Sequence, residues 1–192
     1  MAERWGSCLH SARESKRARI ISDGNGGAII VWHDVRSGSG NYDIYAQRID
    51  ADGDPQWTND GIPVCNASKE QNSPCITSDG IGGAIIMWED FRTNYADLYG
   101  QRINKNGESL WAKNGVLVCG TTGAQSAPEV ISDGTGGAIV TWQDFRRNYA
   151  DMYAQRIDGG GTILWEEWGV AVCNAQGHES FAVIVSNGAE GA

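Results

Sequence analysis

The sequence is poor in proline, phenylalanine and histidine, with 4, 3 and 3 residues respectively among 192. So few prolines exclude a Pro-rich linker, and 41% hydrophobic residues exclude a disordered chain. No apolar run approaches the roughly 18–20 residues of a membrane helix. The first twenty residues contain no apolar segment of a signal peptide. No stretch shows a helical period framed by capping residues. We therefore expect a chain with little helix and no membrane partner.

Positive charge is also scarce, because 15 Lys and Arg oppose 24 Asp and Glu, which gives a net charge of −9. A protein that binds nucleic acid needs a basic surface to displace counterions from the phosphates. Basic residues cluster only near the start, at Arg13, Lys16, Arg17 and Arg19, which we interpret as a solvated end. Nucleic acid is therefore not an expected partner.

Glycine and the large aromatic residues are abundant, with 26 Gly, 8 Trp and 6 Tyr. Aromatic residues favour strands and glycines favour tight turns, so this combination indicates many short strands joined by turns.

An internal repeat organises these residues. The triplet Ser22-Asp23-Gly24 recurs at Ser78 and Ser132, with a weaker copy at Ser186, so the period is about 54 residues. Within each copy the order of motifs is constant: Gly-Gly-Ala-Ile, Trp-x-Asp-x-Arg, Asp-x-Tyr-x-Gln-Arg-Ile, Gly-x-x-x-Trp and Val-Cys. The first copy is longer only between Arg36 and Asp43, around Ser37–Gly40. A length change that the repeat tolerates marks a surface loop directly after Trp-x-Asp-x-Arg.

Each repeat predicts four short strands. In the first copy these lie around Ala18–Ile21, Ala28–Trp32, Asp43–Ile49 and Ile62–Cys65. Ala28–Trp32 is apolar throughout, as expected of a strand buried on both faces. Four strands per repeat, with repeats that cover one another's faces, predict an all-β fold. The expected fold is a β-propeller-like array of about three four-stranded antiparallel blades, incomplete as a single chain. The expected segments are an N-terminal extension or remnant strand (1–14), three repeats (15–70, 71–124 and 125–178) and the first strand of a fourth repeat (179–192).

Closed propellers have roughly four to eight blades, so three blades leave two blade faces uncovered. The sequence therefore predicts either a homo-oligomer that completes a ring or a part of a longer propeller chain.

The combined motifs Gly-Gly-Ala-Ile-Ile-x-Trp-x-Asp, Asp-x-Tyr-x-Gln-Arg-Ile and Asp-x-x-Gly-x-x-x-Trp resemble repeats of large bacterial secreted or surface proteins that form β-propellers. The resemblance covers about residues 15 to 192 and implies an extracellular, periplasmic or cell-surface location, without implying an activity. The segment Asp50 to Trp57 is loosely similar to quinoprotein-type and Asp-box propeller repeats, in which such turns are structural.

Charged residues that recur in every repeat have two interpretations. They are either a ring of ligand-binding groups on one face or pairs that brace each loop, and a feature repeated in every blade favours the scaffold. These residues are Asp34, Arg36, Asp90, Arg92, Asp144 and Arg146. Positions that differ between repeats are better ligand candidates, namely His33, Glu89 and Gln143. Tyr42, Tyr95 and Tyr149, on the loop after Trp-x-Asp-x-Arg, are positioned either to stack on sugars or to pack the loop.

Glu89 and Asp90 are the candidate catalytic residues, because two carboxylates can share acid and base roles. Adjacent strand residues point to opposite faces, however, so the two side chains need not converge. His33 lacks other histidines at a spacing typical of metal ligands.

Asp50, Asp52 and Asp54 resemble the start of a calcium loop. The later copies keep the glycine and lose carboxylates, which favours a turn, so the expected cofactor is none, with calcium as the alternative. The repeated cysteines Cys65, Cys119 and Cys173 are expected to be buried and too far apart for disulfides, whereas a Cys65–Cys75 bond is geometrically allowed.

Three functions follow in order. The first is a non-enzymatic binding or interaction module for a carbohydrate or a protein. The second is a hydrolase or lyase domain acting on polysaccharide, and the third is a structural spacer.

Overall fold

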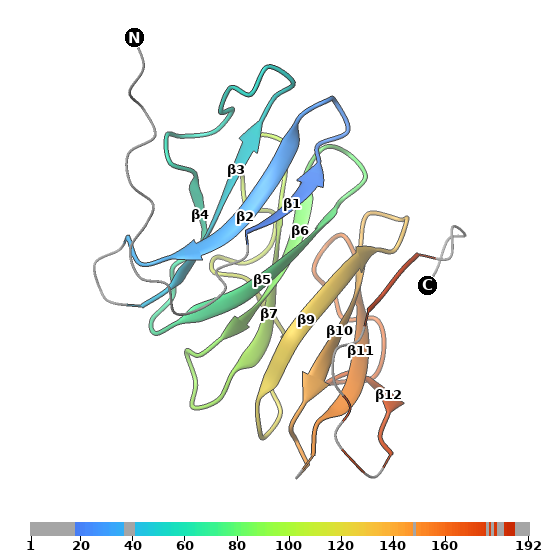
Figure 1. The fold of residues 1–192 in the computed structure, drawn as a ribbon. Helices are drawn as coiled ribbons and strands as arrows, with labels where there is room; N and C mark the ends of the chain where they lie inside the picture. Colours follow the sequence, from blue (N-terminus) through green and yellow to red (C-terminus); the bar gives the residue numbers. More distant parts are fainter. Residues whose placement is uncertain are drawn as a thin grey trace.

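The computed structural model describes residues 18–36, 41–147, 149–175, 177, 179 and 183–186. Within these residues the structure is all-β and contains no helix, so no helix capable of crossing a membrane is found there. Three four-stranded antiparallel sheets lie one behind another, and none closes on itself (Figure 1). The predicted fold class is therefore confirmed: the chain is an open, propeller-like array of three blades.

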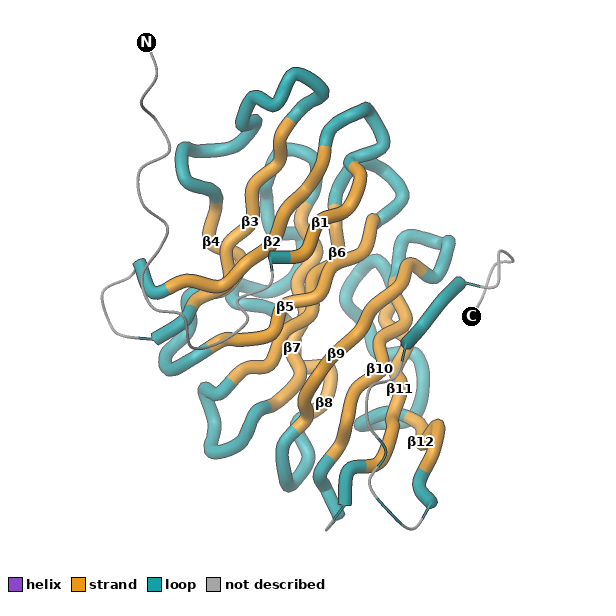
Figure 2. The backbone as a smooth tube through the Cα atoms, viewed as in Figure 1, coloured by secondary structure: helices purple, strands orange, loops and turns teal. Residues whose placement is uncertain are grey.

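The strands of each sheet follow one another in chain order. Blade 1 contains β1 (Arg19–Ser22), β2 (Ala28–Asp34), β3 (Asp43–Ile49) and β4 (Ile62–Cys65). Blade 2 contains β5 (Gln71–Ser78), β6 (Ala84–Asp90), β7 (Asp97–Ile103) and β8 (Val116–Cys119). Blade 3 contains β9 (Gln125–Ser132), β10 (Ala138–Asp144), β11 (Asp151–Ile157) and β12 (Val170–Cys173). Turns and loops join them all (Figure 2).

The first strands of the blades lie on the inside of the array. β5 contacts both β1 and β9. Arg19 of β1 also reaches Glu129 of β9, with 2.8 Å between the charged groups. The inner strands therefore converge, as the first strands of propeller blades do around an axis.

Hydrophobic cores fill the spaces between blades, because successive strand residues point to opposite faces. Ala84, Ile86 and Trp88 of β6 pack against blade 1, whereas Ile85 and Met87 pack against blade 3. All five are fully buried. We name the side of each blade that faces the preceding blade its front face, and the opposite side its rear face. The expectation of a central strand buried on both faces is met in full in blade 2.

The Ser-Asp-Gly turn is held by its aspartate. Asp79 Oδ1 accepts hydrogen bonds from Ile81 N at 3.0 Å and Gly83 N at 2.8 Å. Its Oδ2 accepts from Arg102 Nη2 at 3.0 Å, and Arg102 Nη1 donates to Gly159 O of blade 3 at 2.9 Å. The Gln-Arg motif thus ties each turn to the next blade. Gly83 is required here because a Cβ at this position would lie 2.2 Å from Ile103 O.

Some predicted segments lie outside the described residues: the extension 1–14 with Cys8, and the loop Ser37–Gly40. Glu179 lies at the start of the predicted fourth repeat. Its N donates to Ala150 O at 3.0 Å, as Gln71 N donates to Tyr42 O and Gln125 N to Ala96 O at the starts of β5 and β9. The chain therefore enters the position of a next inner strand after blade 3.

Candidate functional site

The Asp–Arg pair of each repeat lies between blades. In blade 2, Arg92 donates from Nε to Asp90 Oδ1 at 2.8 Å and from Nη2 to Asp90 Oδ2 at 2.6 Å. Trp88 Nε1 donates to the same carboxylate at 2.9 Å. The guanidinium of Arg92 lies 3.8 Å from the ring centre of Tyr99. Asp90 has no exposed surface, so its carboxylate serves the scaffold in this arrangement.

Asp144 and Arg146 repeat this arrangement in blade 3, where Trp142 Nε1 donates to Asp144 at 2.9 Å. In blade 1 the pair Asp34–Arg36 forms as well, but the side chains remain 27% and 36% exposed. Burial raises the pKa of Asp34, but the hydrogen bonds from Arg36 outweigh this effect and hold it below its usual value. The pairs thus have the geometry of loop braces, and their role in ligand binding stays a prediction.

The structure places Glu89 and Asp90 on opposite faces. Glu89 Oε1 accepts a hydrogen bond from Ala127 N of blade 3 at 2.8 Å, whereas Asp90 lies beside Cys65 of blade 1. Ala127 has a φ of 51°, a left-handed conformation at a β-bulge that Glu89 supports. The two carboxylates therefore do not form a pair that could divide acid and base roles.

The other candidates for ligand binding are spread over several loops. The ring of His33 stacks on Tyr42 with 4.8 Å between centroids, and Gln143 is half-buried near the end of β10. Tyr95 and Tyr149 are 59% and 53% exposed on equivalent loops of blades 2 and 3.

Burial of Glu89 raises the pKa of its carboxyl, against hydrogen bonds from Ala127 N and Ser73 that lower it. A pKa above the unfolded value means that charging Glu89 destabilises the fold as the pH rises through that pKa. We therefore expect Glu89→Gln to be more stable than the wild type at pH 8. The difference should shrink as the pH falls, because the wild-type carboxyl then gains its proton. Thermal unfolding from pH 4 to pH 8 measures this, and an advantage that grows at low pH would contradict it.

The three aspartates predicted as a calcium alternative form a turn. Asp50 Oδ1 accepts hydrogen bonds from Asp52 N at 3.0 Å and Asp54 N at 2.9 Å, and its Oδ2 accepts from Gln56 Nε2 at 2.7 Å. Asn104 performs the same Oδ1 role in blade 2. Among the described residues, no group of three metal-ligating side chains converges on one point. The turn is thus complete without a cation.

The four described cysteines are free thiols, so a Cys65–Cys75 disulfide is absent. Cys65 lies instead between blades 1 and 2, with its Sγ 3.6 Å from Asn114 O and 3.5 Å from Arg92 Nη2. Burial raises the pKa of the Cys65 thiol to about 12, which keeps it protonated and unreactive. Cys119 has the same environment between blades 2 and 3.

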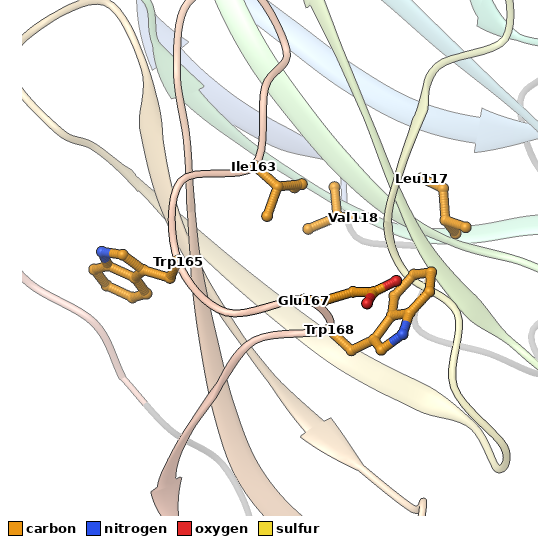
Figure 3. Close-up of a pocket in the computed structure, with 6 residues that line it drawn as sticks. All are labelled: Leu117, Val118, Ile163, Trp165, Glu167 and Trp168. Atoms are coloured by element: carbon orange, nitrogen blue, oxygen red, sulfur yellow. The ribbon is translucent and has the colours of Figure 1, made fainter.

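A groove between β8 and the β11–β12 loop of blade 3 was not predicted. It has a volume of about 380 Å³ and is lined by Leu117, Val118, Ile163, Trp165, Glu167 and Trp168. In Figure 3 the side chains of Glu167 and Trp168 lie together below Leu117, whereas Trp165 points away from them. Leu117 is 38% exposed, Trp168 is half-buried and Glu167 is exposed. The groove therefore offers an aromatic ring, an aliphatic side chain and a carboxylate to solvent.

Trp168 occupies an unusual backbone conformation. Its φ is 66°, and the equivalent residues are Asp60 and Asn114 with φ values of 65° and 62°. Asp and Asn tolerate this left-handed region, whereas a bulky side chain there costs about 1–3 kcal/mol. The signal was present in the sequence, because repeat 3 departs from the other two at this position.

A scan of the chain against protein-family models finds no match, and a search of curated proteins finds no relative. The function therefore has to be argued from the site itself.

Proposed function

We propose that the chain is a non-enzymatic binding module whose groove between blades 2 and 3 binds a neutral carbohydrate. The observation that carries this proposal is the bulky Trp168 in a left-handed conformation. Strain of this kind persists where the surrounding structure holds it, and it concentrates at functional sites.

The scaffold does not require the Trp168 side chain. Each repeat uses only the main-chain carbonyl at this position, which accepts from the arginine of its own blade. Trp168 O accepts from Arg146 Nη2 at 2.8 Å, and Asn114 O accepts from Arg92 Nη2 at 2.8 Å. The indole is therefore an addition of repeat 3 to a turn that is built without it.

The chemistry of the groove suits a sugar. Indole faces pack against the C–H face of a pyranose ring, while carboxylate oxygens accept hydrogen bonds from its hydroxyls. The volume of about 380 Å³ lies within the usual range of small-molecule sites. Glu167, the neighbouring Glu166 and the net charge of −9 disfavour acidic sugars. We therefore propose a neutral saccharide, which also suits the cell-surface setting that the resemblance implies.

A catalytic role has less support. Within the groove only Glu167 can transfer a proton, and hydrolysis of a glycosidic bond requires a second carboxyl group. Glu89 and Asp90 lie on opposite faces of blade 2 and each holds a structural hydrogen bond. Binding without turnover is the proposal that these contacts favour.

The test exploits residues that the repeat itself supplies. Trp168→Asn and Glu167→Lys introduce the residues that blade 2 carries at these positions, Asn114 and Lys113. We expect Trp168→Asn to weaken carbohydrate binding at least about tenfold, since an aromatic contact contributes about 1.5 kcal/mol. Its stability should change little, because relief of the left-handed strain offsets the loss of a half-buried ring. A glycan array with neutral and acidic oligosaccharides identifies the ligand, and calorimetry compares the variants.

Tyr95→Ala is the matched control, because Tyr95 is an exposed aromatic residue outside the groove. Its affinity should equal that of the wild type. If Tyr95→Ala or Tyr149→Ala loses binding and Trp168→Asn does not, the loop tyrosines are the site and the groove is not. If the wild type binds no oligosaccharide, the carbohydrate proposal is wrong and a protein ligand becomes the candidate.

A further inference from the structure

The rear face of blade 3 exposes residues that the other two blades bury. Trp57 and Trp111 are 9% and 8% exposed, whereas the equivalent Trp165 is 38% exposed. Val64 and Val118 are 3% and 1% exposed, whereas the equivalent Val172 is 63% exposed. The difference has a simple cause, since blades 1 and 2 each have a following blade against their rear face.

The front face of blade 1 shows the same change. Trp88 and Trp142 have no exposed surface, whereas the equivalent Trp32 is half-buried. Ile76 is 9% exposed, whereas the equivalent Ile20 is 64% exposed. The side chains that blades 2 and 3 use to receive a preceding blade are thus present on blade 1 without such a partner among the described residues.

The polar contacts of the internal interfaces are also prepared on both faces. Trp57 Nε1 and Trp111 Nε1 donate to the main-chain carbonyls of Lys105 and Gly159 in the next blade, at 3.1 and 3.0 Å. Blade 3 presents the equivalent donor on Trp165, and blade 1 presents the equivalent carbonyl on Ala51. The thiols of Cys65 and Cys119 lie 3.9 and 3.8 Å from the carboxylates of Asp90 and Asp144. Cys173 and Asp34 are the equivalent groups of the two outer faces.

We propose that the rear face of blade 3 binds the front face of blade 1 in a second copy of this chain, head to tail. The occupant is a second copy because each face carries the residues that the blade 1–2 and blade 2–3 interfaces already join. Such an interface is heterologous, and it forms a ring when the rotation between copies closes. Two copies would supply about six blades, which is within the range of closed propellers.

One segment must move for this docking. The chain after blade 3 enters the position of the next inner strand at Glu179, which β1 of the second copy would occupy. Val183 and Val185 are 85% and 72% exposed, and the segment Val183–Ser186 forms no strand. β1 is paired with β2 over four residues. The unpaired segment therefore yields to the incoming β1.

The experiment blocks one face at a time. Val172→Glu places a charge on the rear face of blade 3, and Ile20→Glu places one on the front face of blade 1. Both positions are more than half exposed, so the single blades should stay folded. Size exclusion with light scattering should give two or more chains for the wild type and one chain for each variant. An equimolar mixture of the two variants should form a dimer, because each retains one intact face.

Ile81→Glu is the control, since Ile81 is 72% exposed on a turn of the middle blade, and it should assemble like the wild type. A monomeric wild type at about 100 µM, a concentration at which even a weak interface is populated, would overturn the proposal. A single variant that dimerises alone, or a mixture that stays monomeric, would overturn it too. Trp168→Asn should leave assembly unchanged, so failure of carbohydrate binding and failure of this proposal are separable.

Discussion

Asp90→Asn should lower the free energy of unfolding by about 3 kcal/mol, as expected when one partner of a buried ion pair is removed. Urea denaturation followed by circular dichroism measures the change. A domain of this size has roughly 5–15 kcal/mol of stability, so the loss would be a large fraction of the total.

The reason lies in the contacts of the carboxylate. Asp90 has no exposed surface and accepts hydrogen bonds from Arg92 Nε, Arg92 Nη2 and Trp88 Nε1. An amide oxygen can replace only part of these contacts and carries no charge. The guanidinium of Arg92, whose side chain is 23% exposed, would then lie between blades 1 and 2 without its counterion.

Asp34→Asn is the matched control, because the same pair forms in blade 1 with a carboxylate that is 27% exposed. Exposed pairs are screened by water, so this variant should lose no more than about 1 kcal/mol. Equal losses for the two variants would show that burial between blades does not decide the strength of the pair.

The fold could be predicted from the sequence almost strand by strand. The third and fourth strands of repeat 1 begin and end where they were expected, at Asp43–Ile49 and Ile62–Cys65. The reason is that glycines fix the turns and apolar runs fix the strands, so local signals and inter-blade packing agree. The repeat supplies the same evidence three times, which removes the ambiguity of any single short strand.

The alternation of side chains along a strand also predicted one feature of the candidate site. Because neighbouring residues point to opposite faces, Glu89 and Asp90 were not expected to converge, and the structure separates them between two interfaces. The Cys65–Cys75 alternative was wrong for a related reason. The Cys65 thiol lies in the interface between blades 1 and 2, and Cys75 packs in the core between blades 2 and 3.

The groove was not predicted because no motif marks it. Leu117 belongs to blade 2 and Trp168 to blade 3, so their proximity depends on how two blades stack. The strain at Trp168 depends on a left-handed turn whose position is read from φ values and from the equivalent Asp60 and Asn114. Alignment of the three repeats reveals the exchange of Asn for Trp, but only the structure shows that this position is both strained and exposed.

Trp111→Ala should destabilise the chain by about 3–5 kcal/mol, the usual cost of truncating a buried Trp. Trp111 is 8% exposed, belongs to the core between blades 2 and 3, and donates from Nε1 to Gly159 O at 3.0 Å. Its indole also packs over Gly161, where a Cβ would lie 3.1 Å from the ring. Calorimetric unfolding at low protein concentration measures this cost. A loss below about 1 kcal/mol, typical of surface substitutions, would contradict the assignment of Trp111 to the interface.

Trp165→Ala makes the same substitution one repeat later, where the indole is 38% exposed. In a single chain the cost should be about 1 kcal/mol, since little apolar surface is removed from burial. If a second copy covers this face, the cost should rise with protein concentration, because an associated partner stabilises the folded state by mass action. Trp111→Ala should show no such rise, because its partner blade belongs to the same chain. The concentration dependence thus separates a tryptophan that stabilises the array from one that joins two arrays.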